Sequence, residues 1–338
     1  MRVEEFDYYL PPSAIAQEPA EPRDTSRLLV LDRRASGFKE VLFRDIVHFL
    51  NPGDVLVLND TKVIPARIYG KRPSGGKCEI LLLKDLGEGR WEALLKPSRK
   101  LKPGSQVLVG DVVLRVKERT EDGTKVIEFP SEQDAWKLME AFGQLPLPPY
   151  VKRPLNDQTR YQTVFARTPG STAASTAALH FTEELLKRLR EKGVKVVWFT
   201  LHMGVSSFRP IRTEEVEKHK LVPEYFVLPQ ETAEEVNRAK EEGRRVIACG
   251  TGAVRTLEAR AGEDGKVKAG SGLVDLFIVP GYRFKVVDAM ITNFHMPRSS
   301  HLVLVSAFAG RERVLEAYKW ALERGFRFLS FGDAMLIM

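Results

Sequence analysis

The sequence predicts an α/β protein in which a small antiparallel β-barrel is inserted into a main α/β domain. From Thr182 onward, apolar strand-like runs alternate with helical patterns, as they do in α/β domains with a mostly parallel sheet, either barrel-like or open. Between about residues 62 and 129, short strand-like runs follow one another with Gly- and Pro-rich turns between them, which is typical of a small antiparallel barrel. We therefore expect residues 1–61 and 150–338 to form the α/β domain, and residues 62–149 to form the inserted barrel with its return linker.

The first part of the α/β domain contains a strand, a short helix and a second, buried strand. The strands are predicted at residues 28–31 and 55–58, with a helix from Phe43 to Leu50 between them. The second strand ends at Asn59-Asp60-Thr61. Because open α/β sheets form their sites at the carboxyl ends of strands, Asp60 is a candidate substrate-binding residue.

The inserted segment carries most of the positive charge of the chain. It holds 15 Lys or Arg and 9 Asp or Glu between residues 62 and 129, a net charge of +6 within a chain of net charge +7. Four cations, Lys96, Arg99, Lys100 and Lys102, fall in one predicted loop, which is either a solvated charged loop or a contact for nucleic-acid phosphates. Five strands are predicted, at residues 78–83, 91–95, 106–109, 112–116 and 125–129, followed by a helix at 134–142 and a proline-stiffened linker at 143–150.

The second part of the α/β domain alternates helices and strands. Thr182 is the predicted N-cap of a helix that stops at Gly193. Further helices are predicted at 231–242, 253–261, 302–308 and 314–323, and strands at 194–200, 246–249, 274–279, 286–291 and 326–329.

Three loops in this part combine polar residues with strand or helix ends. His180 follows a segment of small residues and precedes a helix, and His202 ends a strand. Gly250, Thr251 and Gly252 join a strand to a helix that contains Arg255, and amides at such a helix start can hold a carboxylate, a ribose or a phosphate. The alternatives are a flexible linker and structural hydrogen bonds.

Residues 286–310 read as strand, polar turn and wholly apolar helix. Asp288 lies in the predicted strand, Asn293 and His295 lie in the turn, and Ser299 or Ser300 is the expected N-cap. The free N–H groups of the helix would face that turn, where a carboxylate, a phosphate or a polarised substrate fits. A well-capped buried helix that has no ligand is the alternative.

Composition excludes several classes of protein. Hydrophobic residues are 43% and charged residues 29%, as in soluble globular proteins, and no apolar run is long enough to span a membrane. Cys78 and Cys249 fit no metal-binding spacing, so we expect no metal and a reducing cytoplasm. Walker, G-x-S-x-G and H-E-x-x-H motifs do not occur in the sequence.

The chain resembles the S-adenosylmethionine:tRNA ribosyltransferase-isomerases of queuosine biosynthesis. The resemblance rests on motifs in the same order along the whole chain: FDYYLPPSAIAQEP, RDTSRLLVLDR, DVLVLNDTKVIPARI, LPPYVKR, YQTVFA, ALHFT, TLHMG, VIACGTGAVRTLE, PGYRFKVVDAMITNFHMPRSSHLVLVSAFAG and FLSFGDAMLI.

The resemblance implies a reaction with two substrates. The ribosyl part of S-adenosylmethionine, a consumed cosubstrate rather than a bound cofactor, would move to 7-aminomethyl-7-deazaguanine at the wobble position of tRNA and isomerise. Epoxyqueuosine would form in the anticodon region, and adenine and methionine would be released. A cytoplasmic monomer is expected. A non-catalytic RNA-binding protein and an S-adenosylmethionine-dependent RNA methyltransferase remain alternatives.

This sequence departs from the family pattern in several places. Ser175 and Ala178 stand where the family usually has proline and glycine, and Val222-Pro223 stand where it usually has His-Ser. TLHMGVSSF replaces a stretch nearer TLHVGAGTF, and GTGAVR replaces GTTSVR.

Roles for the candidate residues follow from what this chemistry needs: a base beside the sulfonium, a donor for the departing adenine and a site that excludes water. His202 or His180 is the expected base, with His295 as a further catalytic candidate. Asp288 and Arg255 would position polar groups. Gly250, Thr251 and Gly252 would hold the methionine or ribose end, and the remaining predicted substrate-binding residues are Asp60, Arg67 and Asn293.

Overall fold

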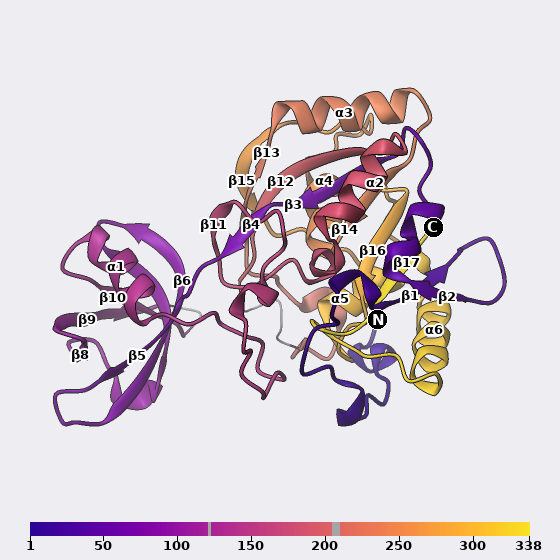
Figure 1. Cartoon of the computed structure of the whole chain (residues 1–338). Helices are drawn as coiled ribbons and strands as arrows, with labels where there is room; N and C mark the ends of the chain where they lie inside the picture. Colours follow the sequence, from indigo (N-terminus) through magenta and orange to yellow (C-terminus); the bar gives the residue numbers. More distant parts are fainter. Residues whose placement is uncertain (121–122, 205–209) are drawn as a thin grey trace. The chain divides into compact units, whose positions relative to one another are not determined.

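The computed structural model describes residues 1–120, 123–204 and 210–338 and divides the chain into two compact units. Unit 1 comprises Met1–Thr61, Pro148–Thr168 and Ala174–Met338, and unit 2 comprises Lys62–Leu147 and Pro169–Ala173. Unit 1 is an α/β structure and unit 2 contains a closed antiparallel barrel, so the predicted fold class is confirmed (Figure 1).

Unit 1 is organised around an open nine-stranded sheet. Its strands, in spatial order, are β15 (Gly270–Val274), β13 (Glu224–Leu228), β12 (Lys195–His202), β3 (Val55–Asn59), β14 (Val246–Cys249), β16 (Ala289–Asn293), β17 (Ala334–Ile337), β1 (Arg27–Leu31) and β2 (Lys39–Leu42). The four adjacent strands β12, β3, β14 and β16 are parallel. Antiparallel pairings extend the sheet on both sides of them. The sheet is therefore mixed, and only its centre is mostly parallel.

Helices cover both faces of this sheet, which explains why its central strands are apolar along their whole length. In β3, Val55 and Val57 pack toward α3, α4, α5 and α6, whereas Leu56 and Leu58 pack toward α2 and two 3₁₀ helices. The bounds are α2 (Glu183–Glu191), α3 (Gln230–Glu241), α4 (Thr251–Arg260), α5 (Ser300–Ala309), α6 (Arg311–Glu323), η4 (Phe43–His48) and η7 (Thr176–His180). None of the helices in the described ranges is long and apolar enough to cross a membrane.

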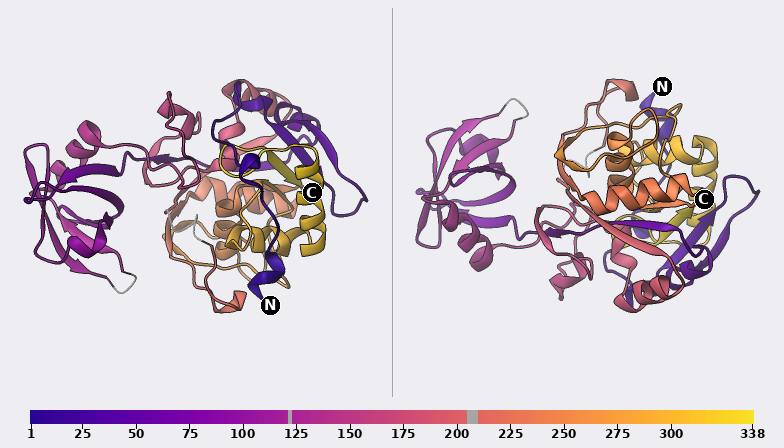
Figure 2. Two further views of the ribbon diagram at one scale, coloured as in Figure 1. Left: turned by 90° about the horizontal axis from the view of Figure 1, so that it is seen from below. Right: turned by 90° about the horizontal axis from the view of Figure 1, so that it is seen from above.

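The two ends of the chain meet in the sheet. β1, the first strand, pairs in parallel with β17, the last one, through residues 28–31 and 334–337. Figure 1 and Figure 2 show these indigo and yellow segments side by side. The first and last strands of unit 1 are thus neighbours in its sheet, whereas unit 2 is formed by internal stretches of the chain.

Several predicted elements have other bounds or another form. The helix predicted from Phe43 to Leu50 is a 3₁₀ helix that spans Phe43–His48. The strand expected from 286 begins only at Ala289, because the amides of Val286 and Val287 donate to the buried carboxylate of Glu258 at 3.0 and 2.9 Å. A side chain on a distant helix thus replaces the ladder hydrogen bonds there.

Two predicted strands are wrong. Residues 275–279 follow β15 rather than forming a strand, and their apolar side chains pack on the core without a ladder. Residues 326–329 also lie outside the sheet, because Phe326 and Phe328 pack into an aromatic cluster around Phe294. The last strand is instead β17, which the sequence pattern did not indicate.

Unit 2 is a barrel of six strands in the order β10-β7-β6-β5-β8-β9. Their bounds are β5 (Arg67–Lys71), β6 (Lys77–Gly87), β7 (Arg90–Lys96), β8 (Gln106–Val109), β9 (Val112–Arg119) and β10 (Lys125–Glu128). The barrel closes where β5 meets β8, and there a Cβ on Gly70 would lie 2.7 Å from Val107 Cγ1, so only glycine allows the approach.

Other elements complete the two units. Helix α1 (Glu132–Phe142), with Ser131 as its N-cap, packs beside β5 in unit 2. A separate two-stranded sheet is formed by β4 (Thr61–Val63) and β11 (Thr168–Ser171).

Candidate functional site

Polar residues gather at one edge of the unit 1 sheet. Because β12, β3, β14 and β16 are parallel neighbours, their carboxyl ends meet there, and they end at His202, Asn59, Cys249 and Asn293. The structure therefore brings together most of the unit 1 residues that the sequence selected: Asp60, His180, His202, Gly250, Thr251, Gly252, Arg255, Asn293 and His295.

His202 and Asp60 lie on the side of this edge that faces α2. The buried Asp60 carboxylate accepts hydrogen bonds from Arg167 Nε and Thr200 Oγ1, both at 2.6 Å. The Nδ1 atom of His202 is 2.8 Å from Thr61 Oγ1, while its Nε2 makes no hydrogen bond to any described residue. Burial lowers the pKa of His202 and the nearby Asp60 raises it in part, so the imidazole is neutral at pH 7 with one nitrogen available.

His180 lies in a closed hydrogen-bond network. Its Nδ1 is 2.7 Å from Ser26 Oγ and its Nε2 is 3.2 Å from Asn293 Nδ2, and its ring stacks on Phe43. Asn293 in turn accepts from Thr176 Oγ1 at 2.8 Å. Since an amide N–H can only donate, Nε2 accepts and Nδ1 carries the proton. Burial lowers the pKa of His180 to about 3, and both ring nitrogens are occupied.

His295 is held at the start of the turn before α5. Its Nε2 is 2.7 Å from Thr292 Oγ1, its amide donates to Tyr318 Oη at 2.9 Å, and its carbonyl accepts from Tyr8 Oη at 2.5 Å. Burial lowers the pKa of this imidazole well below its usual value. Ser299 caps α5 by accepting from Leu302 N, as predicted.

The turn at the start of α4 needs its glycines. Gly250, the N-cap, has φ +89°, a conformation that favours glycine, and its amide donates to Ile291 O at 2.7 Å. A Cβ on Gly252 would lie 2.8 Å from Leu201 Cδ2, so α4 packs directly on the end of β12. Thr251, the first residue of α4, is buried beside them.

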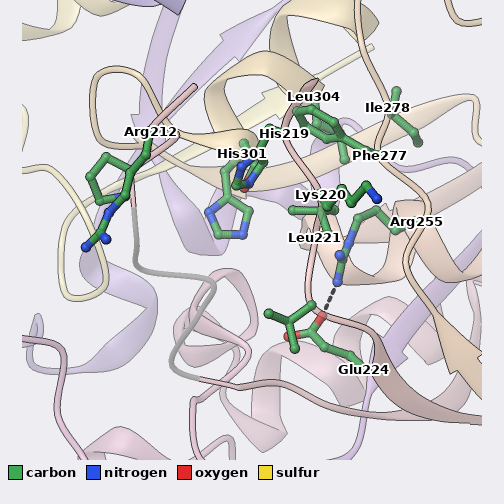
Figure 3. A pocket seen from close by; sticks show the side chains of 13 residues that line it. Arg212, His219, Lys220, Leu221, Glu224, Arg255, Phe277, Ile278, His301 and Leu304 are labelled. Carbon is green, nitrogen blue, oxygen red and sulfur yellow. Dashed lines mark hydrogen bonds and ion pairs between the residues drawn. The ribbon is translucent and has the colours of Figure 1, made fainter. Parts of the chain in front are cut away.

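A cavity of about 230 Å³ opens on the other side of the edge, between α4, α5 and the segments before β13 and after β15. Arg255 lines it and forms a buried ion pair with Glu224, which Figure 3 shows as a dashed line. Two imidazoles, His301 and His219, also line the cavity (Figure 3).

Sequence reasoning missed three of these cavity residues, Glu224, His219 and His301, as site residues. His301 stands in a helix that reads as apolar on all sides, and burial together with the charge of Arg255 lowers its pKa to about 4. Val222 was a signal in the sequence that pointed to this site. It departs from the family pattern, and it lines the same cavity.

Asp288 lies apart from this edge. It precedes β16 and so lies at the amino end of that strand, where its carboxylate accepts from Lys240 Nζ at 2.7 Å and from Val246 N at 2.8 Å. The partners of Asp288 are a cation and a backbone amide of unit 1, which is the arrangement of a structural carboxylate.

The predicted tRNA-binding residues and Arg67 belong to unit 2. Arg67 pairs with Glu79 at 3.4 Å, as does Lys96 at 3.6 Å. Arg99 and Lys100 are exposed on η5 (Ser98–Lys100), and Lys102 follows it, also exposed. The buried Lys125 donates from Nζ to Ser98 O and Leu101 O, so this basic loop is fixed to the barrel wall.

The residues that depart from the family pattern lie in different parts of the structure. Ser175 and Ala178 are buried around η7, and Ser175 Oγ would be 3.6 Å from a Cβ on Gly250. In the stretch 200–208, residues 205–208 lie outside the described residues.

Comparison with known proteins decides the family. The sequence model of a family described as "Queuosine biosynthesis protein" matches residues 3–337. The chain belongs to this family. The resemblance seen in the sequence is therefore confirmed.

Relatives in the family match over their full length. Proteins named S-adenosylmethionine:tRNA ribosyltransferase-isomerase from Halothermothrix orenii and Moorella thermoacetica are each 51% identical, over 100% of both chains. A crystal structure of an S-adenosylmethionine tRNA ribosyltransferase from Thermotoga maritima is 40% identical, covers 99% of this chain and 100% of its own, and superposes with a TM-score of 0.57.

Proposed function

We propose that this chain is an S-adenosylmethionine:tRNA ribosyltransferase-isomerase of queuosine biosynthesis. It moves the ribosyl part of S-adenosylmethionine to 7-aminomethyl-7-deazaguanine at the wobble position of tRNA and isomerises it to epoxyqueuosine. The observation that carries the proposal is the 51% identity over the whole length of both chains to proteins of that name. S-Adenosylmethionine is a consumed substrate, and the enzyme acts as a cytoplasmic monomer.

The carboxyl edge of the unit 1 sheet supplies a site for this chemistry. His202 takes the proton beside the sulfonium through Nε2, while Thr61 holds Nδ1 and thereby fixes the orientation of the ring. His180 orients Asn293 instead, because both of its ring nitrogens are already hydrogen-bonded. The start of α4 at Thr251 and Gly252 offers amides to the ribose, since the amide of Gly250 is used by Ile291 O.

Residues 62–149 form a separate domain in this proposal, and its basic loop contacts the anticodon region of tRNA. Arg99, Lys100 and Lys102 are exposed and Lys96 is mostly so, while Lys125 fixes the backbone that carries Arg99 and Lys100. Cations on a fixed loop bind phosphates at a smaller entropic cost than cations on a mobile one.

One assay tests the function directly. The protein is incubated with S-adenosylmethionine and tRNA that carries the 7-aminomethyl-7-deazaguanine base, and the small products are separated. Release of adenine and methionine in equal amounts supports ribosyl transfer. Adenosylhomocysteine would indicate methylation instead, and the absence of any small product would indicate simple RNA binding.

A further inference from the structure

The cavity beside α4 and α5 has a polar wall and an apolar wall. Its volume of about 230 Å³ is several times the roughly 30 Å³ that one water molecule occupies in the liquid. Arg255 and Glu224 lie on one wall, and Phe277, Ile278 and Leu304 lie on another. The cations Arg212 and Lys220 also line the cavity. A ligand group that fits must therefore combine charge with a short apolar chain.

The ion pair with Glu224 does not use all the N–H donors of Arg255. This arginine is only 8% exposed, and its Nη2 donates to Glu224. Its other N–H groups make no hydrogen bond to residues in the described ranges, although a guanidinium has five donors. These donors are therefore available to an acceptor atom of a ligand in this cavity.

Glu224 affects which anion fits beside Arg255. One of its oxygens binds Arg255 and the other accepts from Gly204 N at 3.0 Å, two residues beyond His202. A phosphate dianion placed on Arg255 would face this carboxylate at close range and be repelled. An α-amino acid avoids the repulsion, because its carboxylate can meet the guanidinium while its ammonium meets Glu224.

We propose that this cavity binds the amino-acid end of S-adenosylmethionine. Arg255 holds the carboxylate, Glu224 holds the ammonium, and the apolar wall with Phe277 and Leu304 surrounds the methylene chain. The inference rests on the proposed function. The amide of Gly204, two residues beyond His202, donates to Glu224, so the cavity borders the carboxyl end of β12.

The test compares two ligands that differ only in the carboxylate. Titration calorimetry measures the Kd of S-adenosylmethionine and of decarboxylated S-adenosylmethionine for wild type and for Arg255→Gln. Wild type should prefer the carboxylated ligand by about tenfold to a hundredfold, the range of a charge-assisted hydrogen-bonded pair, and Arg255→Gln should bind both within about threefold. Arg260→Gln, which removes the same charge at the end of the same helix but outside the cavity, should keep the preference.

A second variant controls for a loss of stability in Arg255→Gln. Arg255→Gln leaves Glu224 buried without its cation, which destabilises the fold, whereas Arg255→Gln/Glu224→Gln leaves no buried charge unpaired. The double variant should also lose the preference. Equal Kd values for the two ligands in wild type, or a full preference in the folded double variant, would overturn this inference while leaving the product assay unaffected. Failure of wild type to release adenine and methionine in the product assay would overturn the proposed function itself.

Discussion

Substitution of His180 tests the hydrogen-bond network at the carboxyl edge of the unit 1 sheet. The substitution is His180→Gln, which keeps polar atoms in the pocket but cannot reproduce the bonds to Ser26 and Asn293, at 2.7 and 3.2 Å. At pH 7.5 the loss of these two bonds should lower the free energy of unfolding by about 1–3 kcal/mol.

The sign and the magnitude of the pH dependence of stability follow from the lowered pKa of His180. Burial and the charges of Arg327 and Arg23 lower the pKa of His180 from about 6.5 to about 3, so the folded protein resists the proton that the unfolded chain accepts. Stability contributed by the neutral ring is complete above pH 6.5 and is lost progressively as the pH falls toward 3. At pH 5.0 the loss amounts to about 2 kcal/mol in wild type and is absent in the variant.

Urea denaturation of both proteins at pH 7.5 and pH 5.0 measures this effect. The stability difference between wild type and His180→Gln should shrink by about 2 kcal/mol at the lower pH. Turnover of the folded variant should stay within a few-fold of wild type, because His180 positions Asn293 rather than transferring a proton. A constant stability difference at both pH values, or a hundredfold drop in turnover, would refute this reasoning.

Three further predictions concern other residues. His202→Asn should lower kcat by about 10²–10⁴-fold and leave the denaturation midpoint nearly unchanged; steady-state kinetics that show normal turnover would exclude His202 as the base. Asp288→Asn removes an ion pair whose side chains are about one-third exposed, so it should cost about 1 kcal/mol of stability in urea denaturation and leave turnover intact, whereas the reverse pattern would support a catalytic role. Reversing the charges of Lys96, Arg99 and Lys100 together should weaken tRNA binding and reduce the salt dependence of its log Kd by about one unit for each phosphate that the loop no longer binds, and an unchanged slope would contradict the proposed role of this loop in tRNA binding.

Local patterns in the sequence determined a large part of the fold. The helices capped by Thr182 and Ser299 begin where their caps predict, because an N-cap depends on residues within one turn. The strand at 55–58 and the antiparallel barrel were also predicted, since apolar runs and turn residues are local signals. The motifs indicated the family because their order along the chain is itself sequence information.

Contacts between residues that are distant in the sequence determined the bounds of β16, the environment of each histidine and the cavity. Glu258 delays the start of β16 and so leaves Asp288 at the amino end of the strand, an effect that arises on a helix far from it along the chain. His180 and His202 look alike in the sequence, yet only packing encloses one of them and leaves a nitrogen of the other available. The cavity of Glu224, Arg255 and His301 exists only because separate segments of the chain meet, and no periodicity along the chain reports such a meeting.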